Sequence, residues 1–409
     1  MKELDVKVGP FFKGMNNRVE SHALPEGTAR NLVNLDVDNS GFCRTRKGMS
    51  KALSCINPKF GYNCPLGMFF IEGPFLKQFN ATTNTSTILF GDITGSYCTF
   101  DYFNGVLYFS DGVVNRKIVS GNVYRWGIGP PSSPIIEAVA GTYSAGVYQA
   151  ALCFVDSQGV ESGSSSVVSI SVGDSTGFTF GLPAILDPQV VATRIYLSTP
   201  NGSELYHVGD TTDTTYTILA GRYDEGNTLE THVISSPPPG RILRHYNGRE
   251  YIADSLGTVW YSEPYSFDQF RLGDNFLQFE DPVDIMEPVT GGIYFAYGDR
   301  TEFWIGNPEE GFEVKDKFSY GAILGTGRKL PNSENVAWQS TRGMVIGTPS
   351  GECKNMQEEN VAVENAASGS VLVREKDGIR QFIASLHQPV DSPMAATSWF
   401  DAEVIRRGE

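Results

Sequence analysis

The sequence repeats a short unit in which a glycine-bearing turn leads into an alternating or apolar strand. Such units occupy residues 103–112, 246–264, 290–306, 341–356 and 377–386. Turns at positions 247, 291, 342 and 378 lie 44, 51 and 36 residues apart, close to the roughly 40 to 50 residues of a four-stranded propeller blade. Because a ring of blades buries faces that a single blade leaves exposed, this spacing predicts an all-β β-propeller of five or six blades. Unrelated hairpins in a sandwich are the alternative.

The turn residues support this prediction. Asn104-Gly105 and Asn247-Gly248 are dipeptides suited to tight hairpins, since both positions tolerate positive φ. The chain of 409 residues contains 44 Gly, 22 Pro, 18 Tyr and 25 Phe, a composition typical of many short strands joined by turns. No long amphipathic helix is predicted.

The interval between the turns at 104 and 247 is too long for one blade. Proline-rich segments at 130–134 and 235–240 bound a different region. Within it the sequence predicts short strands at 148–155, 166–172, 177–182, 192–198, 204–208 and 214–218. Six or seven strands in about a hundred residues is the size of an immunoglobulin-like sandwich. The pattern VYQAALCFVD followed by RIYLS also resembles fibronectin type III-like modules.

The predicted organisation therefore has three parts. Residues 1–128 hold an N-terminal strand and the first part of the propeller, and residues 237–409 hold the remainder of the propeller. Residues 129–236 form an inserted immunoglobulin/fibronectin III-like β-sandwich. Removing this insert restores the blade spacing. A strand in the first 60 residues is expected to complete the last blade and lock the ring.

The most distinctive stretch lies near the start of the chain. It contains GMNN (14–17), LPEG (24–27), NLVNLDVD (31–38) and RTRKG (44–48). This stretch resembles the opening of tail nozzle and hub β-propeller proteins of short-tailed bacteriophages, and of related phage minor tail proteins. Segments 257–264 and 402–407 are similar to the same group. The inserted sandwich does not share the resemblance clearly.

The resemblance implies a structural virion protein, assembled in the host cytoplasm and located in the tail. Several copies, expected to be six, would form a ring next to portal, adaptor and other tail proteins. The ring would form the DNA exit channel, retain the packaged genome and open during ejection, without sequence-specific DNA binding. The sandwich would be available to neighbouring subunits or tail fibres. The alternatives are a receptor-binding or fibre-attachment tail protein, and a propeller glycosidase that acts on host polysaccharide.

Charge and hydropathy limit the classes further. The net charge is −15 with a pI near 4.9, whereas a sequence-reading nucleic-acid binder needs a basic face. The same charge motivates the hypothesis that acidic side chains line the channel. No apolar run reaches the roughly 18 residues of a membrane helix, and residues 1–10 contain no apolar signal core. No membrane-spanning segment and no signal peptide are expected.

Several motifs resemble known sites but are predicted to be turns. Asp36–Gly41 begins like a calcium loop, yet its twelfth position is Lys47, where a bidentate Glu is required. Gly321–Lys329 is glycine-rich but lacks the P-loop pattern. Asp254–Trp260 is similar to an Asp-box turn, with one residue too many between Asp and Gly.

No catalytic, cofactor-binding or metal-binding residue is predicted, and the chain is expected not to be an enzyme. The six cysteines form no C-x-x-C pair, which favours buried reduced thiols over a zinc site. The aromatic residues at 294, 295, 297, 303 and 304 suit either a sugar-binding platform or blade core packing, and core packing is favoured.

Overall fold

The computed structural model describes residues 10–38, 40–46, 51–95, 97–221, 223–363, 366–376 and 379–387. Within these ranges the chain is all-β, as predicted, with one 3-10 turn, η1 (Ser21–Ala23), as its helical element. No helix among these residues is long and apolar enough to cross a membrane. The motif at 402–407, the turn at 377–378 and position 47 of the calcium-like loop lie outside the described residues.

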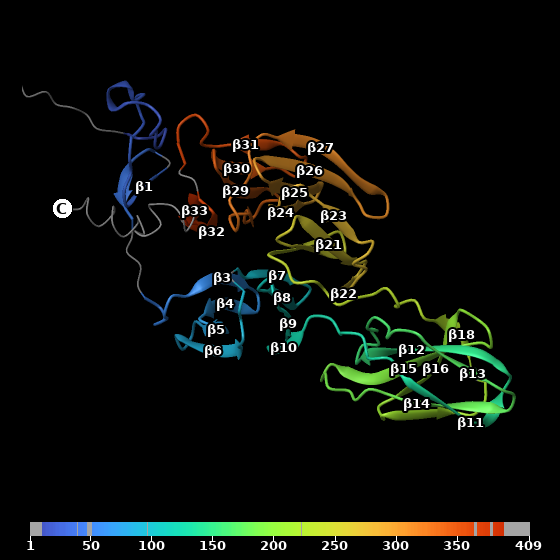
Figure 1. Ribbon diagram of the computed structural model, residues 1–409. Helices are drawn as coiled ribbons and strands as arrows, with labels where there is room; N and C mark the ends of the chain where they lie inside the picture. The colour runs from blue at the N-terminus through green and yellow to red at the C-terminus, as the bar shows by residue number, and fades with distance from the viewer. Residues whose placement is uncertain are drawn as a thin grey trace, which may run out of the picture.

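Five antiparallel sheets carry the propeller pattern, and their strands are hydrogen-bonded in chain order (Figure 1). The first contains β3 (Lys59–Cys64), β4 (Gly67–Glu72), β5 (Phe75–Asn80) and β6 (Thr85–Phe90). The second contains β7 (Thr99–Phe103), β8 (Val106–Ser110), β9 (Asn115–Val119) and β10 (Asn122–Arg125). The third contains β19 (Ile242–Tyr246), β20 (Arg249–Ala253), β21 (Thr258–Glu263) and β22 (Ser266–Phe270), with β23 (Phe276–Gln278) also paired to β21.

The last two of these sheets follow directly along the chain. The fourth contains β24 (Val283–Val289), β25 (Gly292–Tyr297), β26 (Arg300–Asn307) and β27 (Gly311–Phe318). The fifth contains β28 (Arg328–Lys329), β29 (Val336–Ser340), β30 (Gly343–Gly347) and β31 (Cys353–Asn355). A sixth sheet has two strands in the described residues, β32 (Ser368–Lys376) and β33 (Ile379–His387).

Alternate residues of a strand point to opposite faces of its sheet, and here each face packs against a different neighbouring sheet. On β8, Leu107 joins a buried cluster with the first sheet, whereas Tyr108 joins one with the third. On β25, Ile293 packs toward the third sheet and Tyr294 toward the fifth. Successive sheets are therefore joined by apolar layers, as the ring argument from the sequence requires.

The first strands of the sheets meet around one axis. Residues of β3, β7, β19, β24 and β28 line a single cavity there, and residues 369–371 of β32 line the same cavity. The amide of Gly369 donates to the carbonyl of Leu324 at 2.8 Å, which ties β32 to the segment before β28. The molecule is a β-propeller, which confirms the predicted architecture.

The tight hairpins are confirmed. Asn104-Gly105 and Asn247-Gly248 each form a two-residue turn between the first two strands of a sheet. All four residues have positive φ, between 47° and 83°, as a type I′ turn requires. The corresponding turn of the first sheet, at Pro65-Leu66, carries no such dipeptide and was not predicted.

Residues between the second and third sheets form two further sheets that share one core. One sheet has β11 (Ile135–Tyr143), β14 (Thr176–Gly181) and β17 (Thr215–Ile218). The other has β12 (Gly146–Asp156), β13 (Val168–Val172), β15 (Val190–Ser198), β16 (Leu205–Thr211) and β18 (Asp224–Thr228). Phe178 of β14, Leu152 of β12 and Ile195 of β15 meet in the core between them. Strands β11 and β18 were not predicted, and the immunoglobulin or fibronectin identity of the unit stays a prediction.

The N-terminal segment differs from the prediction. Its strands β1 (Leu35–Val37) and β2 (Cys43–Thr45) pair with each other in the described residues and complete no blade. Asp38 accepts the amides of Ser40 and Phe42, so a local turn closes this hairpin. The side chain of Asn17 instead bonds the backbone of Ala362 in both directions, at 3.1 and 2.7 Å, and so ties the segment to the chain that follows the fifth sheet.

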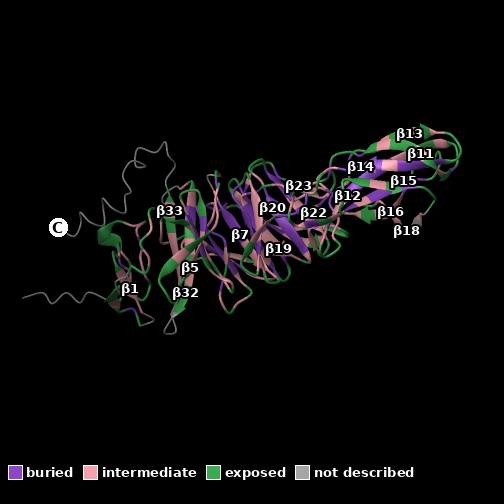
Figure 2. Ribbon diagram, turned by 90° about the horizontal axis from the view of Figure 1, so that it is seen from below, coloured by how far each residue is buried: buried purple, intermediate pink, exposed green. Residues whose placement is uncertain are grey.

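The three units lie in a row. Figure 2 shows the N-terminal hairpin at one end, the propeller in the middle and the sandwich at the other end. Contacts between sandwich and propeller include a hydrogen bond from Gln269 Nε2 to the carbonyl of Glu161 at 2.7 Å. The buried clusters of the sandwich and of the propeller contain no residue in common.

Separate cores predict separable unfolding transitions. Phe178→Ala empties a fully buried site in the sandwich and is expected to cost about 3 to 5 kcal/mol. Leu107→Ala empties one in the propeller and is expected to cost about 2 to 5 kcal/mol. Each variant should lower one transition in differential scanning calorimetry, and the exposed Val113→Ala control should lower neither. A core variant that lowers both transitions equally would contradict the division of the chain into a sandwich and a propeller that unfold separately.

Candidate functional site

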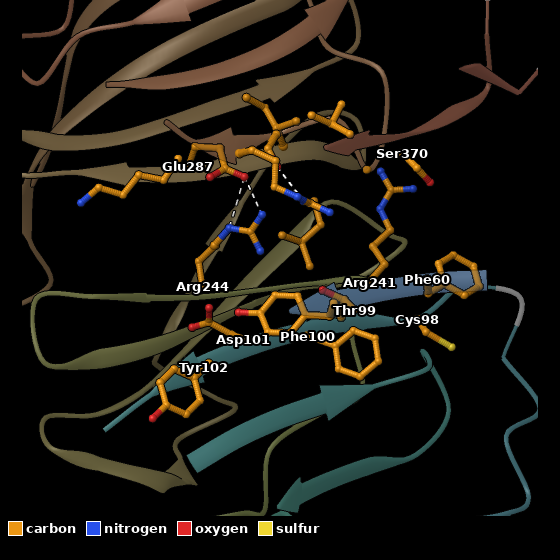
Figure 3. Close-up of a pocket in the computed structure, with 18 of the residues that line it drawn as sticks. Phe60, Cys98, Thr99, Phe100, Asp101, Tyr102, Arg241, Arg244, Glu287 and Ser370 are labelled. Carbon is orange, nitrogen blue, oxygen red and sulfur yellow. Dashed lines mark hydrogen bonds and ion pairs between the residues drawn. The ribbon is translucent and has the colours of Figure 1, made fainter. Parts of the chain in front are cut away.

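A cavity of about 580 Å³ lies on the propeller axis and is lined by the first strands of the sheets (Figure 3). This volume falls in the roughly 300–1,000 Å³ range of small-molecule sites. Aromatic side chains form part of the wall. The charged lining residues are the cations Arg241, Arg244, Arg328 and Lys329 and the carboxylates Asp101, Asp284 and Glu287. Charges from four different sheets are thus brought together in one partly enclosed space.

Two of the arginines are held by carboxylates of β24. Arg244 donates from Nε and Nη2 to Oε1 of Glu287, at 3.2 and 2.5 Å. Figure 3 shows the Arg244 side chain between Glu287 and Asp101. Arg241, just before β19, donates from Nη2 to Oδ1 of Asp284 at 2.9 Å. Because the Glu287 side chain is only 4% exposed, salt screens the pair with Arg244 weakly, and these contacts connect the third sheet to the fourth.

Asp101 is the carboxylate of the second sheet in this cavity. Its Oδ2 accepts the backbone amide of His245 at 2.9 Å, which connects β7 to β19. Burial raises the pKa of Asp101 to about 6, although the neighbouring Arg244 opposes the shift. Burial also raises the pKa of Asp284 to about 6, against the effect of Arg241. Both carboxyls therefore change charge at mildly acidic pH.

Arg328 of β28 has a different environment. Its Nη1 donates to the carbonyl of the preceding Gly327 at 2.7 Å, and no carboxylate of the described residues makes an ion pair with it. Burial lowers the pKa of Arg328, and the like charge of Arg244 lowers it further. A guanidinium stays protonated under these conditions, so the cavity contains a cation whose charge is not directly paired.

A second polar group lies behind the cavity wall. Glu250 of β20 is fully buried, and neither of its carboxyl oxygens has a hydrogen-bond partner among the described residues. Nδ1 of His245, equally unpartnered, lies 3.9 Å from Oε2. Burial raises the pKa of Glu250 well above its usual value and lowers that of His245 to about 4. Both shifts favour the neutral forms, as expected for unpaired groups in an apolar interior.

The glycine-rich segment at 321–329 is more than the predicted turn. It contains β28 and lines the cavity with Gly325 and Gly327. A Cβ on Gly327 would lie 2.4 Å from Oε1 of Glu287, and one on Gly325 would lie 2.4 Å from the carbonyl of Gly369. The absence of side chains at these positions therefore lets β28 approach β24 and β32.

The other motifs are structural in the described residues. Asp254 accepts the amides of Leu256 and Thr258, so the Asp-box-like segment is a turn between β20 and β21, as predicted. Asp36 and Asp38 pair with Arg46 and Arg44 around the β1–β2 turn. No group of three His, Cys, Asp or Glu side chains that could hold a metal ion occurs in the described ranges.

The aromatic and cysteine predictions have different outcomes. Tyr294, Phe295, Tyr297 and Phe303 are buried in the blade cores, which confirms core packing over an exposed platform. All six cysteines are free thiols. Cys98 and Cys153 are buried, as predicted, whereas the other four are half-buried, so the predicted burial is wrong for those four.

Sequence reasoning did not identify the charged residues of the cavity. Arg241, Arg244 and His245 follow one another within RILRHY, a strand with basic side chains among apolar ones. Their place in one cavity is recognised only when β19 is known to be the strand of its sheet that lies nearest the propeller axis.

Comparison with protein-family models finds no match, and no curated protein matches the chain. Among solved structures, the chain is similar to BBS1N from its complex with ARL6DN at 9% identity and a TM-score of 0.32, over 80% of this chain and 87% of that one. The β-propeller domain of Myceliophteria thermophila Cps50 (Swd1) is 8% identical with a TM-score of 0.29, over 75% and 88%. The WD40 domain of Neurospora crassa Pan2 is 11% identical with a TM-score of 0.28, over 74% and 78%. The propeller assignment rests on the sheet order and the axial cavity.

The Arg244–Glu287 ion pair on the propeller axis predicts that its loss destabilises the protein far more than the loss of a surface ion pair. Glu287→Gln removes the buried carboxylate bonded to Arg244, so that Asp101 is the remaining carboxylate near this guanidinium, and it is expected to destabilise the propeller by about 3 kcal/mol. Glu334→Gln breaks the pair with Lys329, in which both side chains are more than half exposed, and should cost less than about 1 kcal/mol. Urea unfolding of both variants measures the difference. Equal losses of unfolding free energy in the two variants would show that the Arg244–Glu287 pair does not stabilise the contact between the third and fourth sheets.

The raised pKa of Glu250 predicts a pH-dependent effect. The folded protein binds this proton more tightly than the unfolded chain, so the contribution of Glu250 to wild-type stability falls as pH rises above about 4. Glu250→Gln removes the titration, and its stability relative to wild type should be greater at pH 8 than at pH 4.5 by about 1 kcal/mol or more. Urea unfolding at the two pH values tests this, with the exposed Glu313→Gln as control. If the stability difference between Glu250→Gln and wild type were the same at both pH values, Glu250 would not be a buried, neutral carboxyl.

Proposed function

We propose that this chain is a structural virion protein, a subunit of the nozzle or hub ring in the tail of a short-tailed bacteriophage. In this proposal about six copies form a ring that bounds the DNA exit channel, retains the packaged genome and opens during ejection. The neighbours would be portal, adaptor and other tail proteins, with fibres as further possible contacts. The proposal includes no catalytic role.

The observation that carries the proposal is the arrangement of three units in a row (Figure 2). The N-terminal segment that ends with the β1–β2 hairpin, residues 10–46, contains most of the stretch, residues 14–48, that resembles phage tail proteins. It lies at the opposite end of the propeller from the sandwich. A subunit with separate modules at its two ends can contact different neighbours at two levels of an assembly, because each module offers its own surface.

The surface supports contacts of this kind. Exposed large apolar side chains occur on all three units, among them Phe42 of the N-terminal hairpin, Leu256 of the propeller and Leu186 of the sandwich, with exposed fractions of 63%, 78% and 90%. Single exposed apolar residues are normal on a monomer. Their presence on every unit suits a subunit whose interfaces extend along its length.

The axial carboxylates bear on the glycosidase alternative. A glycosidase needs one free acid and one free base flanking the sugar. Asp284 and Glu287 are each bonded to an arginine, and Asp101 accepts a backbone amide. This environment fixes the carboxylates in structural contacts, and we therefore favour the structural role over catalysis.

The test is the mass of the purified full chain by native mass spectrometry, alone and with the portal and adaptor proteins of its virion. The expected result is a ring of about six copies that binds the adaptor and has a central channel by electron microscopy. The lining of that channel, which a single chain does not contain, is expected to be acidic. A stable monomer or trimer that binds host cells would contradict the ring and favour the receptor-binding alternative.

A further inference from the structure

The axial cavity is lined by three arginines and three carboxylates, besides Lys329, and one of the arginines makes no ion pair in the described residues. Arg241 faces Asp284 and Arg244 faces Glu287, each pair within hydrogen-bond distance. Lys329 pairs with Glu334 outside the cavity lining. Arg328 lines the cavity with no ion-pair partner among the described residues. Arg328 is half-buried, and burial together with the like charge of Arg244 lowers its pKa, although the carboxylate of Glu287 opposes this shift.

Donors near Arg328 are also unused. The Nε of Arg241 is buried and has no hydrogen-bond partner in the described residues. Tyr97 lines the same cavity, and its hydroxyl would lie 2.7 Å from a Cβ placed on Gly325, two residues before Gly327. The charges of Arg328, Arg244 and Arg241 all act on this hydroxyl. Guanidinium and phenol groups that can donate are therefore close together in one space.

We propose that the axial cavity is a binding site for an oxyanion, a carboxylate, phosphate or sulfate group of a small molecule, held by Arg328 with support from Arg241 and Tyr97. The guanidinium of Arg328 has five N–H donors in a planar fork, of which one is used by Gly327. This fork matches two oxygens of a carboxylate or of a tetrahedral oxyanion. The inference is independent of the ring assembly.

The cavity has room for such a group. Its volume of about 580 Å³ exceeds what an inorganic oxyanion alone needs, so the ligand that carries the group can be larger. The aromatic residues Phe60, Tyr62 and Phe103 on the opposite strands supply apolar surface for the remainder of the molecule.

The experiment is isothermal titration calorimetry of the full chain with sulfate, inorganic phosphate and malonate at constant ionic strength. We expect saturable binding with one site and a dissociation constant of about 1 mM or below. Preference for malonate would assign the site to carboxylates, and preference for sulfate and phosphate to tetrahedral oxyanions. Salts that are excluded from the protein surface stabilise it without saturation. Saturable binding in the titration therefore indicates a site and not a general salt effect.

Variants of one sheet supply the controls. Arg328→Gln should weaken binding at least tenfold, and Arg328→Lys, which keeps the charge but loses the fork, should weaken it several-fold. Arg342→Gln removes an exposed arginine of the fifth sheet that makes no ion pair in the described residues, and it should bind as wild type. Circular dichroism verifies folding of each variant. Absence of saturable binding to all three anions, or equal binding by wild type and Arg328→Gln, would overturn the proposal.

Discussion

The structure depends on the need of each antiparallel sheet to cover two apolar faces. Successive side chains on β8 and β25 point to opposite faces, and both faces are buried against neighbouring sheets. A single sheet of this kind would leave both apolar faces in water. The propeller resolves this by placing the second, third and fourth sheets each between two others, so that both apolar faces of each of these sheets are covered.

The same constraint produces the axial cavity. When the sheets pack side by side, their first strands converge, and residues such as Asp101, Arg244 and Glu287 are brought from distant parts of the chain to one axis. The ion pairs between β19 and β24 then connect sheets at a place where apolar packing ends. Arg328 bonds the carbonyl of Gly327 but makes no ion pair in the described residues, and this is the basis for the proposed anion site.

The sequence predicts the periodic part of the fold well, because turn chemistry is local. Asn104-Gly105 and Asn247-Gly248 require positive φ and form the predicted hairpins. Pro65-Leu66 lacks that signal, and its turn was missed. The N-terminal strand that was predicted to complete the last blade is not seen in the described residues, where β1 and β2 pair with each other and Asp38 closes their turn. The cavity could not be predicted, because the convergence of Asp101 with His245, 144 residues apart, depends on the packing of the second sheet against the third across the inserted sandwich.

Amide hydrogen exchange of the full chain tests ring closure most directly. If β32 packs into the ring beside the segment before β28, its amides should exchange as slowly as those of the inner strands β7 and β19, and more slowly than the outer strand β6. Exchange of β32 at the rate of the surface loops, with β7 and β19 protected, would contradict a closed propeller and would leave the axial cavity open on that side.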